Sequence, residues 1–116
     1  MGKNDRFEKV YRMLIEDTKI ALPNTKILLC ETFVLCGTAT EHAYDKFLEV
    51  KEYAKVVKKL AEEYGLFFLP LQQLVEDYAK KHTVEACLWD GVHPNIAGAK
   101  LIANAWVEFF KKEIDK

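Results

Sequence analysis

The stretch KILLCET, residues 26–32, decides how this chain folds. Its middle is a nearly continuous apolar run, which is typical of a strand buried on both faces of a parallel sheet. A second apolar run, LFFL at residues 66–69, ends at Pro70 and predicts another short strand. Helical patterns separate and surround the two runs. Because strands that alternate with helices indicate βαβ units, we expect an α/β fold with a parallel sheet.

Four segments have the apolar spacing of amphipathic helices. They span residues 6–22, 45–64, 72–81 and 96–114. Gly65 suits the left-handed C-cap of the second helix, and Asn95 suits the N-cap of the last. The expected buried face of the last helix consists of Ile96, Leu101, Ile102, Ala105, Trp106 and Phe109. Gly98 on the same helix would allow close packing against a neighbouring strand.

Two strands are few for a parallel α/β domain, although 116 residues are enough for one domain. We therefore interpret residues 1–116 as a single partial domain, the second half of a larger one. The sheet would then end in an edge with unpaired backbone groups. Such an edge favours self-association through strand pairing or through exchange of elements between copies.

The composition argues against several classes of partner. A net charge of −1 and a pI near 6.3 give no reason to expect nucleic acid, and no apolar run approaches the length of a bilayer span. Three cysteines in unpaired spacing predict free thiols and a cytoplasmic protein. Cys30 is expected to be buried. A zinc site built from Cys36, His42 and Cys87 lacks the close ligand pair that such sites usually contain.

The candidate chemistry lies in WDGVHPN, residues 89–95. Asp90 and His93 are three residues apart in a turn where Gly91 lets the backbone bend and Pro94 prevents helix formation. Asp90 can bond one ring nitrogen of His93, which leaves the other nitrogen to act as a general base. The alternative is an aspartate that caps the turn locally beside a surface histidine with no role.

A second candidate region is the loop at residues 33–44, which follows the first strand. Ligands bind at the carboxyl ends of strands in open α/β sheets. The apolar start of this loop, Phe33, Val34 and Leu35, would therefore line a substrate pocket. The same three residues would equally suit the end of a strand tucked into the core, and the sequence leaves both readings open.

Three motifs resemble the SGNH, or GDSL-type, hydrolases. Asp90-Gly91-Val92-His93-Pro94-Asn95, followed by Gly98 and a closing amphipathic helix, resembles the last block of that family, which supplies the catalytic Asp and His. Gly2-Lys3-Asn4-Asp5 resembles the Gly-x-Asn-Asp block, so the resemblance implies that Asn4 donates to the oxyanion hole. Glu31-Thr32-Phe33-Val34-Leu35 is similar to members that act on small acyl esters, often on carbohydrates.

The resemblance implies a three-layer, flavodoxin-like α/β/α sandwich, of which this chain would be the C-terminal half. It implies a serine esterase that acts on a small ester substrate, with no metal or organic cofactor. The family's Gly-Asp-Ser block is missing, and the sequence contains no serine. We therefore expect the chain to be inactive alone. The alternatives are a non-catalytic α/β module that binds a partner through its sheet edge, or a ligand-binding remnant that uses the 33–44 loop.

Overall fold

Two short parallel strands lie at the centre of the computed structural model, which describes residues 3–115, with the backbone alone at residues 3 and 4. Strand β1 (Leu28–Cys30) pairs with β2 (Phe67–Leu69), with Leu29 opposite Phe68. The predicted parallel pairing is confirmed. The regular strands are shorter than the apolar runs that predicted them, although the hydrogen bond from Glu31 N to Leu69 O (2.9 Å) continues the ladder.

Helices account for most of the remaining chain. They are α1 (Lys3–Ala21), α2 (Tyr44–Phe47), α3 (Glu49–Tyr64), α4 (Gln72–Lys81) and α5 (Ile96–Phe109), with a 3₁₀ turn η1 (Glu41–Ala43) and a π-helical turn η2 (Phe110–Ile114). The expected helix over residues 45–64 breaks at Leu48, and α1 begins three residues earlier than the pattern indicated. Both predicted caps are confirmed: Gly65 is left-handed at φ 66°, and Asn95 Oδ1 accepts the Gly98 N–H at 2.9 Å.

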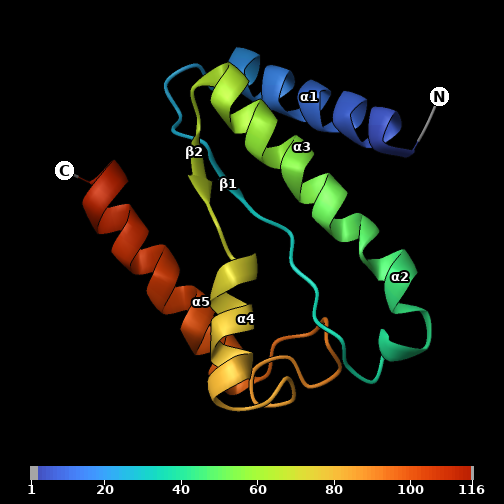
Figure 1. Cartoon of the computed structure of the whole chain (residues 1–116). Helices are drawn as coiled ribbons and strands as arrows, with labels where there is room; N and C mark the ends of the chain where they lie inside the picture. Colours follow the sequence, from blue (N-terminus) through green and yellow to red (C-terminus); the bar gives the residue numbers. More distant parts are fainter. Residues whose placement is uncertain (1–2, 116) are drawn as a thin grey trace.

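The helices lie on both sides of the strands, in the layered arrangement that the sequence predicted. Helices α1 and α3 lie together on one side, and α5 runs along the other (Figure 1). The main core is the cluster between β1, α1 and α3, formed by Ile15, Leu29, Val57, Leu60 and Ala61. A second cluster of Leu35, Val75, Cys87 and Leu88 lies beneath the candidate turn. The chain is therefore a partial α/β fold.

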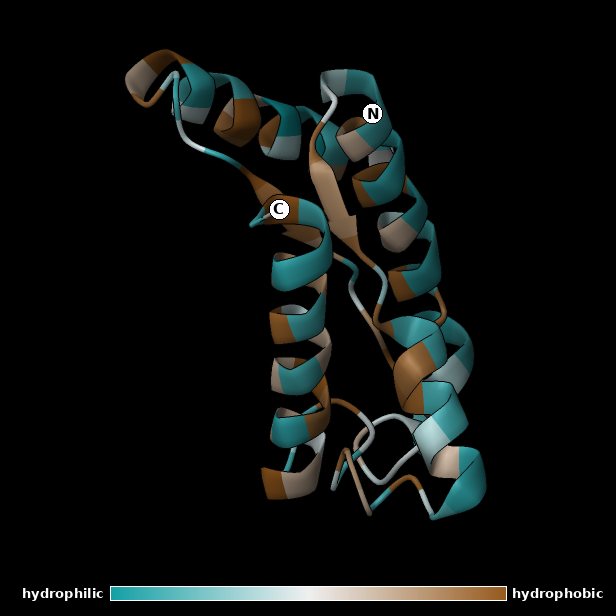
Figure 2. Cartoon of the chain, turned by 90° about the vertical axis from the view of Figure 1, so that its left-hand side faces the viewer, coloured by the Kyte–Doolittle hydropathy of each residue, from teal (hydrophilic) through white to brown (hydrophobic). Residues whose placement is uncertain are grey.

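Much apolar surface is left uncovered. The chain measures 42 × 41 × 18 Å, and its radius of gyration of 15.5 Å exceeds the value of about 13 Å expected for a compact domain of this length. The expected burial of the α5 face is wrong at Ile96 and Trp106, which are 79% and 43% exposed. The other four residues of that face are half-buried: Leu101, Ile102, Ala105 and Phe109. Hydrophobic segments are visible along α5 (Figure 2), where an open groove of about 470 Å³ is lined by Pro94, Ala99, Ile102, Ala103, Trp106 and Val107.

Cys30 is exposed, so its predicted burial is also wrong. Side chains alternate along a strand, and the neighbouring Leu29 faces the core with 6% exposure. Cys30 therefore points to the opposite face of the sheet, which α5 leaves partly uncovered. None of the helices within residues 3–115 combines the length and apolarity that crossing a bilayer requires.

Truncating the main core should destabilise the chain strongly. Leu60 is fully buried, so Leu60→Ala should lower the free energy of unfolding by about 2–5 kcal/mol through lost burial and a residual cavity. Ile20 on α1 is 80% exposed, and Ile20→Ala should change that free energy by no more than about 0.5 kcal/mol. Urea denaturation measures both. Equal effects of the two substitutions would contradict this description of the core.

The exposed apolar groove on α5 should promote self-association, because apolar patches of this kind mark contact surfaces. We expect light scattering to show a molar mass that rises with protein concentration. Trp106→Lys should reduce the association, whereas Asn104→Lys, at an exposed polar position of the same helix, should leave it unchanged. A wild-type chain that stays monomeric at high concentration would refute this expectation.

Candidate active site

The turn at residues 90–93 is built around the carboxylate of Asp90. Asp90 is 6% exposed, and its Oδ1 atom accepts the backbone N–H groups of Val92 (2.9 Å) and His93 (2.8 Å). Gly91 adopts a φ of 96°, a region that L-residues rarely populate, so glycine suits the bend. The carboxylate of Asp90 thereby fixes the backbone of His93.

The second oxygen of Asp90 bonds the imidazole. Asp90 Oδ2 lies 2.6 Å from His93 Nδ1, which confirms the predicted side-chain contact. The backbone N–H and the ring of His93 hold the pKa of Asp90 at about 2, below its ordinary value of 3.8. An ionised carboxylate only accepts hydrogen bonds, so Nδ1 carries the proton of the neutral ring and Nε2 offers its lone pair. The His93 side chain is 70% exposed and accessible to a reaction partner.

The start of α5 holds the turn from its C-terminal side. Asn95 donates its backbone N–H to Cys87 O (3.0 Å) and its side-chain amide to Glu85 O (2.8 Å). Gly98 packs so closely that a Cβ there would lie 2.1 Å from Cys87 O. The predicted close approach at Gly98 is therefore real, but its neighbour is the backbone of the 83–88 turn instead of a strand.

The structure places the other predicted site residues as follows. Val34 and Leu35 are 1% and 7% exposed, which is the core position that the sequence left open, and Phe33 is half-buried against the second cluster. Asn4 lies in the first turn of α1, and its side chain falls outside the described residues, as does Gly2. The contact between Asp90 and His93 is thus the part of the predicted site that the structure brings together.

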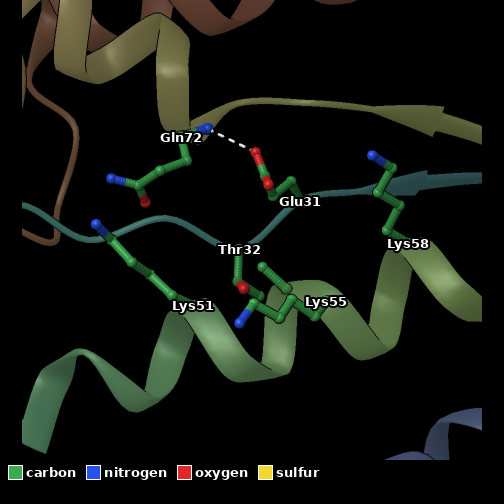
Figure 3. A pocket seen from close by; sticks show the side chains of 7 residues that line it. Glu31, Thr32, Lys51, Lys55, Lys58 and Gln72 are labelled. Carbon is green, nitrogen blue, oxygen red and sulfur yellow. Dashed lines mark hydrogen bonds between the residues drawn. The ribbon is translucent and has the colours of Figure 1, made fainter.

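Glu31 has a structural partner that the sequence did not reveal. Its Oε1 atom accepts the backbone N–H groups of Leu71 and Gln72, both at 2.8 Å, and so caps the first turn of α4. Glu31 lines an open cavity of about 310 Å³ with Lys51 and Lys55 of α3, and neither Asp90 nor His93 belongs to its lining (Figure 3). No three potential metal-binding side chains gather within the part of the chain that the structure describes.

Gln72 was also missed by the sequence analysis. Its side chain accepts the N–H of Val34 and donates to the carbonyl of Val34, both at 2.9 Å, so it pairs with the backbone as a strand would. This pairing fixes the segment that continues β1 towards the candidate turn. A glutamine at a helix start carries no sequence signal for such a role, because the partner is the backbone of a distant residue.

Comparison with known proteins decides the family. The model of the GDSL-like lipase/acylhydrolase family matches residues 2–106. The chain belongs to this family. A GDSL-like lipase from Parabacteroides merdae has a similar structure, with a TM-score of 0.85 and 36% identity over 92% of this chain and 49% of that one.

An acetylxylan esterase from Geobacillus stearothermophilus is 29% identical over 103 residues, which are 89% of this chain and 45% of the esterase. A crystal structure of the acetylxylan esterase Axe2 from that organism superposes with a TM-score of 0.73 and 28% identity, over 90% of this chain and 46% of that one. The present GDSL-family chain therefore spans about half the length of the relatives it matches.

The bonds of Asp90 predict a pH dependence of stability. Because its folded pKa of about 2 lies below 3.8, the unfolded chain binds more protons between these values. The ionised carboxylate of Asp90 therefore stabilises the folded chain above about pH 4, and this stabilisation is lost as the pH falls towards 2. Asp90→Asn keeps an oxygen for the two backbone amides but has no carboxylate to titrate. The difference in unfolding free energy between wild type and Asp90→Asn should shrink over this window in urea denaturation, and a constant difference would contradict the assignment.

Proposed function

We propose that this chain carries the aspartate and histidine of an ester-hydrolysing site whose serine lies in sequence outside these 116 residues. The observation that carries the proposal is the 2.6 Å contact between Asp90 Oδ2 and His93 Nδ1, with Oδ1 occupied by two backbone amides. This geometry fixes the ring and its tautomer and leaves Nε2 open. It is the arrangement required of a general base that activates a hydroxyl nucleophile.

In the proposed mechanism, His93 Nε2 takes the proton of the serine hydroxyl as the oxygen attacks the ester carbonyl. Asp90 orients the ring and stabilises the imidazolium that forms, without itself taking the proton. Asn4 donates a hydrogen bond to the oxyanion of the tetrahedral intermediate. His93 then returns the proton to the leaving alcohol, and water releases the acyl group from the serine by the same steps in a second cycle.

The proposed substrates are small acyl esters, including acetyl esters on carbohydrates. The acetylxylan esterase from Geobacillus stearothermophilus supports this choice through its likeness over nine-tenths of the present chain. Two solved forms of that enzyme are described as catalytic mutants, in which a serine or an aspartate is replaced by alanine. This agrees with the role that we propose for Asp90 and with the need for a serine from elsewhere.

The decisive experiment compares the 116-residue chain with the chain extended by the coding sequence upstream of Met1. We expect the chain alone not to hydrolyse a short-chain aryl acetate, since it contains no serine. The extended protein should hydrolyse the acetate, and His93→Ala should lower its kcat/KM by a factor of about 10³ or more. His82→Ala is the matched control, because this exposed histidine lies at the end of α4 and should be dispensable.

Two results would contradict the proposal. One is turnover by the chain alone that survives His93→Ala. The other is an extended protein whose activity is the same with and without His93. The alternative, a non-catalytic binding module, is favoured by the absence of serine and by the apolar groove on α5. It predicts that the extended protein is also inactive and that substitutions in the groove, such as Trp106→Lys, abolish partner binding.

A further inference from the structure

The backbone of the Asp90 turn rests on a second loop, at residues 35–40. Leu35 donates its N–H to Gly91 O (2.9 Å), and Ala39 donates its N–H to Asp90 O (2.9 Å). The two carbonyls that flank the bend are therefore held by amides from two positions of one loop. A change in the shape of this loop would move the peptide groups on either side of Gly91, and the Asp90 carboxylate with them.

The two loops touch backbone to backbone. A Cβ added at Gly37 would lie 2.6 Å from the carbonyl carbon and oxygen of Asp90 and from Gly91 N. A Cβ added at Gly91 would lie 2.6 Å from Leu35 O. No side chain separates the loops at this point to absorb a displacement. A shift of the 35–40 loop would therefore displace the turn that carries Asp90 and His93.

One buried hydroxyl closes the 35–40 loop on itself. Thr40 is fully buried, and its Oγ1 atom donates to Leu35 O (2.7 Å) and accepts the N–H of Gly37 (2.8 Å). The hydroxyl has one hydrogen and two lone pairs, so one atom serves a donor and an acceptor of the loop at once. Without it, both backbone groups would be buried without a partner, which is costly.

We propose that Thr40 is a positioning residue for the Asp90–His93 pair: its hydroxyl holds the 35–40 loop in the shape that supports both carbonyls at the bend. Its importance for catalysis rests on the function proposed above, whereas its effect on the geometry of the pair does not. Thr40 does not touch the reacting atoms, and it acts through Leu35, Gly37 and Ala39. Its hydroxyl, and not its bulk, is the group that matters.

Conservative substitutions separate the hydroxyl from the shape of the side chain. Thr40→Val keeps the shape and removes the hydroxyl, and Thr40→Ser keeps the hydroxyl and removes a methyl group. Thr38→Val is the matched control, because Thr38 is exposed in the same loop. Leu60→Ala controls for a general loss of stability, because Leu60 belongs to the main core between α1 and α3.

The readout is the tautomer of neutral His93 in the 116-residue chain, measured from the ¹⁵N shifts of its ring nitrogens. An Asp90 carboxylate that accepts from Nδ1 keeps the proton there. The Nδ1–H form of His93 should be the majority tautomer in the wild type and in three variants: Thr40→Ser, Thr38→Val and Leu60→Ala. Thr40→Val should lose that majority to the Nε2–H form. If Thr40→Val does not fold, Thr40→Ala is measured in its place with the same expectation.

Retention of the Nδ1–H majority in the folded hydroxyl-free variant would overturn the proposal. So would its loss in Leu60→Ala or Thr38→Val to the same extent, since the effect would then be general loosening. The activity of the extended protein is a separate test. Loss of the tautomer preference in Thr40→Val, together with full activity of extended His93→Ala, would support the positioning role and refute the catalytic one.

Discussion

The carboxylate of Asp90 is the group on which the candidate site depends. One oxygen accepts two backbone amides of its own turn, and the other holds the imidazole of His93 at 2.6 Å. The same side chain thus contacts both the backbone of the turn and the ring of the base, while the 35–40 loop holds the carbonyls of Asp90 and Gly91. Hydrogen bonding to the charged form keeps the pKa of Asp90 near 2, so the acceptor stays ionised wherever an esterase would work. The side-chain bonds that orient the base therefore lie within four consecutive residues, and the backbone of these residues rests on the 35–40 loop.

The rest of the fold buries apolar side chains well on one side of the strands and poorly on the other. The main core lies between β1, α1 and α3, whereas the apolar side of α5 lies open. The chain spans about half the length of its GDSL-family relatives, and the two-stranded sheet within residues 3–115, with one partly covered face, agrees with that proportion. The open groove on α5 is a proposed contact surface. Ile96 and Trp106 of α5, which periodicity placed inside, are exposed.

Sequence reasoning predicted the parts that depend on local rules. The apolar runs predicted the parallel pair, Gly65 and Asn95 predicted two caps, and the spacing of Asp90 and His93 predicted their contact. Sequence reasoning failed where contacts between distant residues determine burial. Cys30 looked buried, but only one face of the sheet is well covered, and nothing in the 33–44 loop distinguishes the buried Thr40 from the exposed Thr38. The Thr40 hydroxyl bonds Leu35 O and Gly37 N where the 35–40 loop meets residues 90 and 91, a contact that a single sequence does not reveal.

The most direct test of the account is the crystal structure of the extended protein after reaction with a phosphonyl fluoride, a reagent that labels activated serines covalently. The account predicts one labelled serine, with its Oγ within about 3.2 Å of His93 Nε2, while Asp90 Oδ2 still bonds Nδ1. A labelled serine far from His93, or a His93 ring turned away from Asp90 in that structure, would contradict the claim that these two residues activate the nucleophile.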